Sequence, residues 1–159
     1  MENIRGNIVH EALRSIMYLD ENLEEQIDAA LAVPALIGDS LPSSHRMTTD
    51  EIRSRTRETL LRFLRSDAVQ PFFRRVENRE VTTEQEFIDS NGHLFRCDRI
   101  VIDPQEVCVI DFKTGNTQPE SQYKQQMHRY IEHLKNIFPE CHVRGVIAYV
   151  DACTIRSVE

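Results

Sequence analysis

The chain has 159 residues, of which 40% are hydrophobic and 28% charged, and its formal net charge is −7. This length provides for one domain or for a fragment of a larger protein, and the low content of Gly (5) and Pro (6) excludes a collagen-like or low-complexity chain. The acidic balance excludes a protein that holds nucleic acid by bulk electrostatics, so any contact with nucleic acid must be local.

Targeting signals and cysteine motifs are absent from the sequence. No apolar run approaches the roughly 18 residues of a membrane helix, and the first residues lack the apolar segment of a signal peptide. The cysteines are far apart and form no Cys-x-x-Cys motif, which indicates neither a zinc knuckle nor a disulfide framework. We therefore expect a cytoplasmic protein with reduced thiols and no membrane contact. The cysteines are Cys97, Cys108, Cys141 and Cys153.

Helical periodicity dominates the first part of the chain. Apolar residues recur at helical spacing over residues 4–19 and again over 24–36, and a polar loop is expected at 38–46. A capping box opens a third helix over about 48–66, which has an apolar face. The sequence therefore predicts a mainly helical part over residues 1–70.

A glycine and a histidine share one face of the first predicted helix. Gly6 lies four residues before His10, so the missing side chain would let another backbone or a ligand approach the imidazole. Taken alone, His10 is as well explained by a helix surface or a satisfied core position.

The middle of the chain changes to short alternating segments separated by turn residues. These segments predict three strands, at about Arg79–Ile88, Leu94–Ile102 and Val107–Phe112. Turns are expected at 89–92 and 103–106. The three strands therefore form a meander.

A helix and two strands complete the predicted fold. The helix begins near Pro119 and stops at Pro139. The segment Val143–Val150 is apolar on both faces, as expected of a strand in the middle of a sheet, and Thr154–Val158 predicts an edge strand. The sequence thus predicts an α/β fold with a central mixed sheet and flanking helices over residues 71–159.

Two carboxylates face each other in the predicted meander. If the second turn closes symmetrically, Asp103 pairs with Glu106, and counting outward puts Asp98 opposite Asp111. Like charges at this spacing destabilise a sheet unless something positive lies between them, and a hard divalent cation fits that place. Alternation puts Lys113 on the same face, where its ammonium would orient a water or stabilise negative charge.

A structural explanation of these acids is also open. Asp98 and Asp111 would then be solvated positions, each paired with Arg99 or Lys113. The strand around Asp111 is otherwise almost continuously apolar, however, and a buried charge without a partner is costly. This argument favours a functional site.

The motifs around these residues resemble the PD-(D/E)xK nuclease superfamily. An Asp-Arg-Ile strand (98–100) precedes an Asp-Phe-Lys-Thr-Gly strand (111–115), a Gly-x-x-x-His helix (6–10) lies upstream, and Gln126 and Tyr130 form a later Gln-x-x-x-Tyr element. The order of these motifs is most similar to RecB-like nuclease domains at the C-terminal ends of UvrD/Rep-type helicases such as AddA and RecB. The resemblance covers nearly the whole chain.

The resemblance implies a fold, an activity and partners. It implies a restriction-endonuclease-like core and a single RecB-like nuclease domain over residues 1–159, as a fragment of a larger helicase-nuclease. The activity would be hydrolysis of DNA phosphodiester bonds in repair or recombination, with an exonuclease the expected type. The partners would be single-stranded DNA and helicase domains of the same or a partner chain. The cysteine spacing lacks the arrangement of the iron–sulfur relatives, so no cluster is expected.

The resemblance also implies the roles of the site residues. His10, Asp98, Asp111 and the backbone carbonyl of Phe112 would hold Mg²⁺ or Mn²⁺, and Lys113 would position or polarise the attacking water. This cation would lower the pKa of bound water and neutralise charge on the phosphate. A catalytically silent module that docks DNA or helicase domains is the alternative.

The identity of an additional acid stays open at this point. The family carries an acidic residue on the strand before Asp98, and by resemblance this corresponds to Glu80. Symmetric pairing around Asn91, in contrast, brings Thr83 and Glu84 nearest to Asp98. The sequence does not decide between the two glutamates.

The last predicted helix carries the expected DNA contacts. By resemblance these are Gln126, Tyr130 and Tyr123, which lie on one helical stripe. The same stripe is equally that of an amphipathic helix with aromatic core residues.

Overall fold

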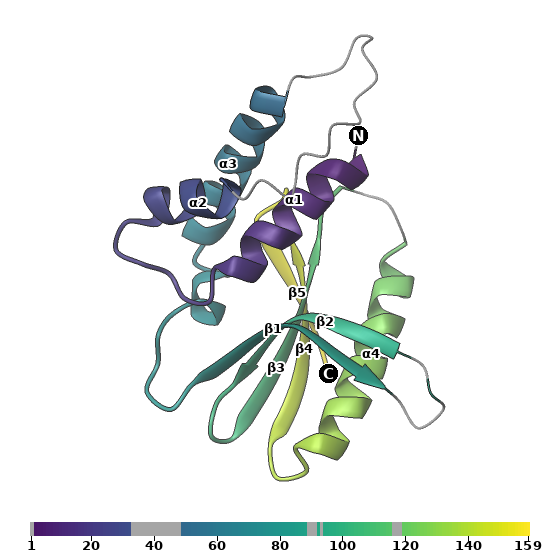
Figure 1. The fold of residues 1–159 in the computed structure, drawn as a ribbon. Helices are drawn as coiled ribbons and strands as arrows, with labels where there is room; N and C mark the ends of the chain where they lie inside the picture. The colour runs from purple at the N-terminus through teal and green to yellow at the C-terminus, as the bar shows by residue number, and fades with distance from the viewer. Residues whose placement is uncertain (1, 33–48, 89–91, 93, 116–118) are drawn as a thin grey trace.

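The computed structural model describes residues 2–32, 49–88, 92, 94–115 and 119–159. Its centre is a five-stranded mixed sheet, in which the strands lie side by side in chain order (Figure 1). The strands are β1 (Glu80–Ile88), β2 (Leu94–Ile102), β3 (Glu106–Lys113), β4 (His142–Tyr149) and β5 (Thr154–Val158).

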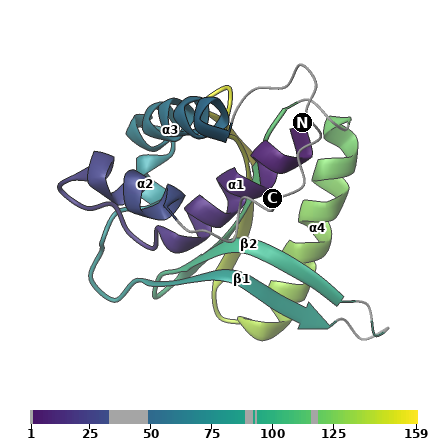
Figure 2. The ribbon, with the colours of Figure 1, turned by 45° about the horizontal axis from the view of Figure 1, so that its top comes forward.

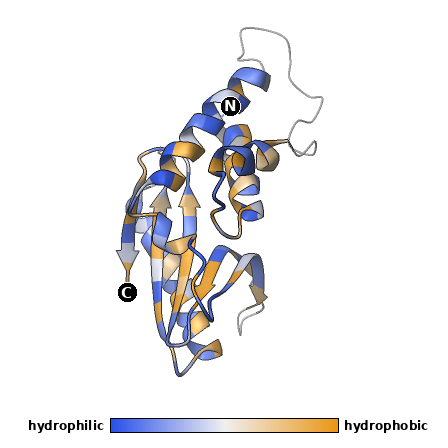
Figure 3. Ribbon diagram, turned by 90° about the vertical axis from the view of Figure 1, so that its left-hand side faces the viewer, coloured by the Kyte–Doolittle hydropathy of each residue, from blue (hydrophilic) through white to orange (hydrophobic). Residues whose placement is uncertain are grey.

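Helices cover both faces of this sheet, which confirms the predicted α/β fold. The N-terminal helices lie on one face, and the long helix that precedes β4 covers the other (Figures 2 and 3). Each face buries its own apolar cluster against the sheet. Among the described residues, no helix has the length and apolar character to cross a membrane. The N-terminal helices are α1 (Glu2–Ser15), α2 (Leu23–Leu31) and α3 (Thr49–Arg65), with a short 3₁₀ turn η2 (Gln70–Phe72), and the long helix is α4 (Glu120–Ile137).

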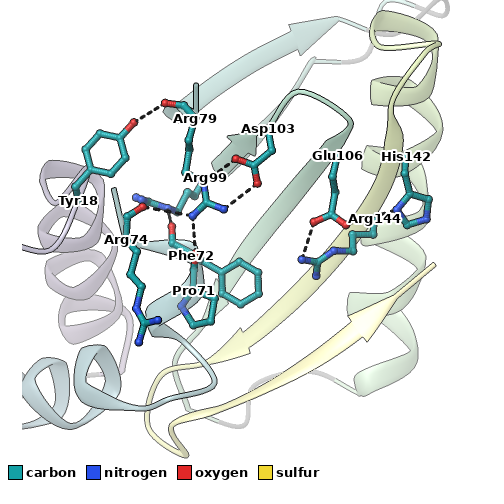
Figure 4. A network of polar contacts seen from close by, with 10 residues as sticks. All are labelled: Tyr18, Pro71, Phe72, Arg74, Arg79, Arg99, Asp103, Glu106, His142 and Arg144. Atoms are coloured by element: carbon teal, nitrogen blue, oxygen red, sulfur yellow. Dashed lines mark hydrogen bonds and ion pairs between the residues drawn. The ribbon is translucent and has the colours of Figure 1, made fainter. Parts of the chain in front are cut away.

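The sheet agrees closely with the predicted meander. β1, β2 and β3 pair antiparallel, α4 crosses over to β4, which is parallel to β3, and β5 is an antiparallel edge strand. In the β2–β3 turn, Asp103 N–H donates to the carbonyl of Glu106 (2.8 Å), as the symmetric turn requires. Arg79 braces this turn by donating to both carboxylate oxygens of Asp103, each at 2.8 Å (Figure 4). Of the predicted turn at 89–92, only residue 92 lies within the described residues.

The helical part differs from prediction at its boundaries. The first helix ends at Ser15 rather than near Leu19, because the chain after Ser15 is bound to the sheet instead of to a further helical turn. The second helix ends at Leu31, and the predicted continuation and the loop at 38–46 lie outside the described residues.

Arg99 makes the attachment that ends α1. Its side chain is 0% exposed, and its guanidinium donates to the carbonyls of Ile16 (3.0 Å), Met17 and Phe72 (3.2 Å; Figure 4). The guanidinium also lies 4.0 Å from the centre of the Phe73 ring, a cation–π contact. Arg99 therefore fastens α1 and η2 to β2, whereas the sequence offered it as a partner for the neighbouring carboxylates.

A glycine brings α4 close to the sheet. A Cβ atom at Gly145 in β4 would lie 2.4 Å from the Met127 side chain of α4, so no larger residue fits without movement of the methionine. The apolar stripe of α4 packs into this close contact. Its members are Tyr123, Met127, Tyr130, Ile131 and Leu134.

Candidate metal-dependent active site

The sheet divides at one end and forms a cleft. The β2–β3 ladder ends at the pair Arg99–Ile110, and beyond it β2 pairs with β1 while β3 pairs with β4. α1 and α4 flank this opening (Figure 2). The resulting cleft has a volume of about 620 Å³. It is lined by Asn7, His10, Glu11, Arg14, Glu84, Arg96, Asp98, Asp111, Lys113, Gln126 and Tyr130.

In both strands of the β1–β2 hairpin, the regular alternation of side chains between the two faces of the sheet is interrupted beside this cleft. We call this interruption the phase change. Arg99 contacts the residues that directly follow α1, and its neighbour Asp98 contacts His10 of α1 on the same face of the sheet, although successive strand residues normally face opposite ways. Cys97 then packs in the α4 cluster. On β1, Glu84 opposes this point and has a positive φ of 54°. Because both strands change phase at the same place, the pairing register is kept while Glu84 and Asp98 both point into the cleft.

Three potential ligands for a metal ion converge there. His10 Nδ1 lies 3.4 Å from Asp98 Oδ2, and one ligand atom from each of His10, Glu84 and Asp98 lies within 4.8 Å of the others. Two ligands bound at 2.0–2.6 Å to one ion are at most about 5 Å apart, so these side chains fit a single hard divalent cation. The two carboxylates supply the oxygen donors that Mg²⁺ and Mn²⁺ prefer.

The choice between Glu80 and Glu84 is decided in favour of Glu84 as far as position is concerned. Glu84 is the cleft residue, while Glu80 pairs with Ile102 at the other end of β1 and is exposed. Four residues of strand separate the two glutamates by about 13 Å. The prediction that placed Glu80 in the site by resemblance is therefore wrong, and the count from the turn was the better guide.

Asp111 and Lys113 form an ion pair on the wall of the same cleft. Lys113 Nζ lies 2.6 Å from Asp111 Oδ2, as alternation along β3 predicts. Asp98 also contacts this strand, since its Oδ2 accepts a hydrogen bond from the Phe112 N–H (2.8 Å). The register of the ladder, continued by one residue, brings Asp98 opposite Asp111. Phe112 thus joins the site through its amide, and the role predicted for its carbonyl stays a prediction.

Burial and neighbouring charge perturb the acid–base behaviour of the site. Burial, together with the charge of Asp98, raises the pKa of Asp111 to about 6, although Lys113 opposes this shift. Burial lowers the pKa of His10, but contact with Asp98 and the charges of Asp98, Asp111 and Glu84 outweigh it, so that this pKa is raised. Without a cation, the cleft therefore holds excess negative charge that favours bound protons.

Asp111→Asn is expected to stabilise the metal-free protein at pH 7.5 by about 1–3 kcal/mol in urea unfolding with EDTA. The folded-state pKa of Asp111 is raised from 3.8 to about 6, so the stability present below pH 3.8 is lost as the pH rises through 6. Asparagine avoids this loss, and the gain should vanish at pH 4. A destabilised variant at pH 7.5 would mean that the ion pair with Lys113 outweighs burial.

Lys113 is held from the α4 side by a chain of contacts. Its Nζ donates to Gln126 Oε1 (3.3 Å), Gln126 Nε2 donates to Tyr130 Oη (2.5 Å), and Tyr130 Oη donates to the carbonyl of Arg96 (3.0 Å). The ammonium also lies 4.6 Å from the centre of the Tyr123 ring. These contacts fix the ammonium beside Asp111.

The two tyrosines therefore differ from the predicted DNA contacts. Tyr123 and Tyr130 are only 6% and 5% exposed and belong to the core that α4 makes with the sheet, although Tyr130 also reaches the wall of the cleft. Gln126 is half-buried and lines the cleft. The tyrosine rings are therefore the core residues of an amphipathic helix. Gln126 is more exposed than either tyrosine and stays a candidate DNA contact.

Gly6 brings α1 to the end of β3. A Cβ atom at this position would lie 3.0 Å from Thr114 Oγ1, so the glycine admits the threonine hydroxyl rather than a ligand of the imidazole. The loop after β3 is held further by Asp151, which accepts a hydrogen bond from the Gly115 N–H (2.8 Å) and pairs with Arg5 of α1. Sequence reasoning missed this brace because its members are distant in the chain.

Comparison with known proteins identifies a family. A family model described as the PD-(D/E)XK nuclease superfamily matches residues 1–154, which is nearly the whole chain. No curated protein matches the chain. The match spans every element that contributes a side chain to the cleft.

Proposed function

The chain belongs to the PD-(D/E)XK nuclease superfamily, and from this premise we propose that it is a metal-dependent deoxyribonuclease domain that hydrolyses DNA phosphodiester bonds. The observation that carries the proposal is the meeting of Asp98, Asp111 and Lys113 in one cleft, with His10 and Glu84 beside them. Members of the superfamily typically use divalent metals, and the acidic cluster fits one.

The carboxylates and the imidazole would hold Mg²⁺ or Mn²⁺. His10, Glu84 and Asp98 offer the converging ligand atoms, and Asp111 and the carbonyl of Phe112 complete the proposed set. The cation would supply Lewis acidity at the phosphate and lower the pKa of a water molecule. Asp98 keeps its orientation through the Phe112 amide, so its carboxylate is preorganised for this task.

Lys113 is proposed to orient the attacking water and to stabilise charge that develops on the phosphate. The Gln126 amide and the Tyr123 ring hold its ammonium at the cleft wall, where it need not reorganise during the reaction. Gln126 is also the proposed DNA contact on α4. Tyr123 and Tyr130 are assigned as supports beneath the site because they are buried.

The substrate is proposed to be a single strand delivered by a helicase. A net charge of −7 opposes binding of a polyanion by the isolated domain, so affinity must be local or supplied by an attached motor. We propose that residues 1–159 form one RecB-like nuclease domain of a larger helicase-nuclease that acts in cytoplasmic DNA repair or recombination, with exonuclease the expected type of cleavage.

Cleavage of DNA tests the proposal. End-labelled linear single- and double-stranded DNA and circular single-stranded DNA are incubated with Mg²⁺ or Mn²⁺ and with wild type, Asp111→Ala or Lys113→Ala. Metal-dependent cleavage that both substitutions abolish supports the nuclease, and sparing of the circles supports an exonuclease. Cleavage that survives Asp111→Ala contradicts the site. If wild type binds Mn²⁺ in calorimetry without cleaving, the nuclease needs its helicase, while absence of both supports a docking module.

Metal affinity is expected to rise steeply between pH 5.5 and 7.5. The pKa of His10 is raised and that of Asp111 lies at about 6, so both groups must release protons before they bind a cation. The dissociation constant of Mn²⁺, measured by calorimetry, should fall by roughly tenfold or more over this range. His10→Asn should flatten the profile, and a pH-independent affinity would contradict the ligand assignment.

A further inference from the structure

Arg96 lies on the wall of the cleft and forms an ion pair with Glu84, one of the candidate metal ligands. Its Nε lies 2.7 Å from Glu84 Oε2, while its side chain is 59% exposed. The main chain of Arg96 is anchored, because its carbonyl accepts the hydrogen bond of Tyr130. The guanidinium can therefore move without disturbing β2.

Each of the three carboxylates proposed as metal ligands has a partner within the protein. Asp111 pairs with Lys113, Asp98 accepts from the Phe112 amide and lies beside His10, itself a candidate ligand, and Glu84 pairs with Arg96. The amide is fixed by the backbone, and Lys113 is only 18% exposed and held from two sides. Of these partners, the one on a long, exposed side chain is Arg96.

We propose that Arg96 and the divalent cation compete for Glu84, so that metal loading releases the Arg96 guanidinium to bind a phosphate of the DNA strand. The inference rests on the proposed function and adds a coupling between metal and substrate to it. A DNA phosphate bound at the cluster would be within reach of the guanidinium, since Arg96 precedes Asp98 by two strand residues, about 7 Å.

The chemistry of the released group fits this partner. A guanidinium offers a planar fork of donors that matches two oxygens of one phosphate. Before release, its charge is neutralised by Glu84, and the unoccupied carboxylates repel DNA. After release, the cation neutralises the carboxylates and the arginine is available. By linkage, metal must then increase DNA affinity, and DNA must increase metal affinity by the same factor.

The first test measures metal alone. Arg96→Gln leaves Glu84 without a competitor, so Mn²⁺ should bind about 2- to 5-fold more tightly in calorimetry, as expected for loss of a partly exposed ion pair. Arg14→Gln is the matched control, because Arg14 lines the same cleft but pairs with Glu11 on its own helix. That variant removes the same charge and should change affinity much less.

The second test measures DNA binding in a Lys113→Met background, which prevents cleavage. A fluorescent single-stranded oligonucleotide should bind more tightly when Mn²⁺ is added. Arg96→Gln should reduce this metal-dependent affinity by roughly tenfold and lower the slope of log affinity against log salt by about 0.7, the value of one phosphate contact. Glu84→Gln should weaken Mn²⁺ binding and reduce the metal dependence of DNA binding.

The two tests separate this inference from the proposed function. If wild type binds Mn²⁺ and cleaves DNA, but Arg96→Gln and Arg14→Gln have the same Mn²⁺ affinity and the same salt slope, the competition is refuted and the nuclease stands. If wild type binds no Mn²⁺, both fall together. The competition is supported if Arg96→Gln, but not Arg14→Gln, binds Mn²⁺ more tightly and shows a smaller slope of log DNA affinity against log salt.

Discussion

Asp98→Asn is expected to lower the rate of DNA cleavage by roughly 10²- to 10³-fold and to weaken Mn²⁺ binding strongly. Asp98 contacts both His10 and the Phe112 amide, so its carboxylate joins α1 to β3 at the candidate metal site. Asparagine can still accept the amide hydrogen bond, but it removes the charge that a divalent cation requires, which is worth several kcal/mol in the transition state. Cleavage assays and calorimetry give the two values.

Glu80→Gln is the control for this loss. It removes a carboxylate from the same hairpin, but at an exposed position opposite Ile102. Its cleavage rate and Mn²⁺ affinity should match wild type within about twofold. Equal losses in Asp98→Asn and Glu80→Gln would show that general charge, rather than the cluster at His10, determines metal binding.

Arg99→Met is expected to destabilise the fold by about 3–5 kcal/mol in urea unfolding. The substitution keeps much of the buried volume but removes the donors to the carbonyls of Ile16, Met17 and Phe72, which then remain buried without partners. Burial lowers the pKa of Arg99 to about 10, so the guanidinium is still charged at neutral pH and the loss includes charge-assisted hydrogen bonds.

Two further variants qualify this result. Arg57→Met breaks exposed ion pairs with Asp28 and Glu24, which solvent screens, so its loss of stability should be far smaller than that of Arg99→Met. Arg99→Lys retains the charge but lacks the planar fork, so its stability should lie between those of wild type and Arg99→Met. If Arg99→Met unfolds no more easily than Arg57→Met, the contacts with α1 contribute little to stability.

The sheet was largely predictable because hairpin turns define register. The positions of the turns placed Asp103 opposite Glu106 and Glu84 beside Asp98, and the structure has the pairs that this counting requires. The edge strand Thr154–Val158 was also predicted with its correct bounds. In each of these cases the turn residues and the apolar pattern of the neighbouring segments were sufficient to predict the strand pairing or the strand bounds.

The phase change at Glu84 and Asp98 was not predictable from the sequence. Strict alternation would send Asp98 and Arg99 to opposite faces, whereas both face α1. The cause is a positive φ at Glu84, a residue type that seldom adopts this conformation, together with a matching change on β2. Neither composition nor spacing contains a signal for it.

Contacts between elements that are distant in the chain could not be predicted from the sequence either. The burial of Tyr130 depends on the packing of α4 against β2, where its ring stacks on Phe95, and the pairing of Arg96 with Glu84 depends on the phase change. The resemblance to a family predicted which residues gather at the site. It did not predict which of them face the cleft and which support it from below.

The attachment of α1 through Arg99 has a consequence for synthesis of the chain. Met17 and Arg99 are 82 positions apart, so α1 leaves the ribosome long before its partner strand does. Until then its apolar face can pack only against α2 and α3 and has no sheet to cover it, so this face is exposed to aggregation during synthesis. The candidate ligands His10 and Asp98, which lie on α1 and β2, can likewise meet only after the β2 segment has been synthesised.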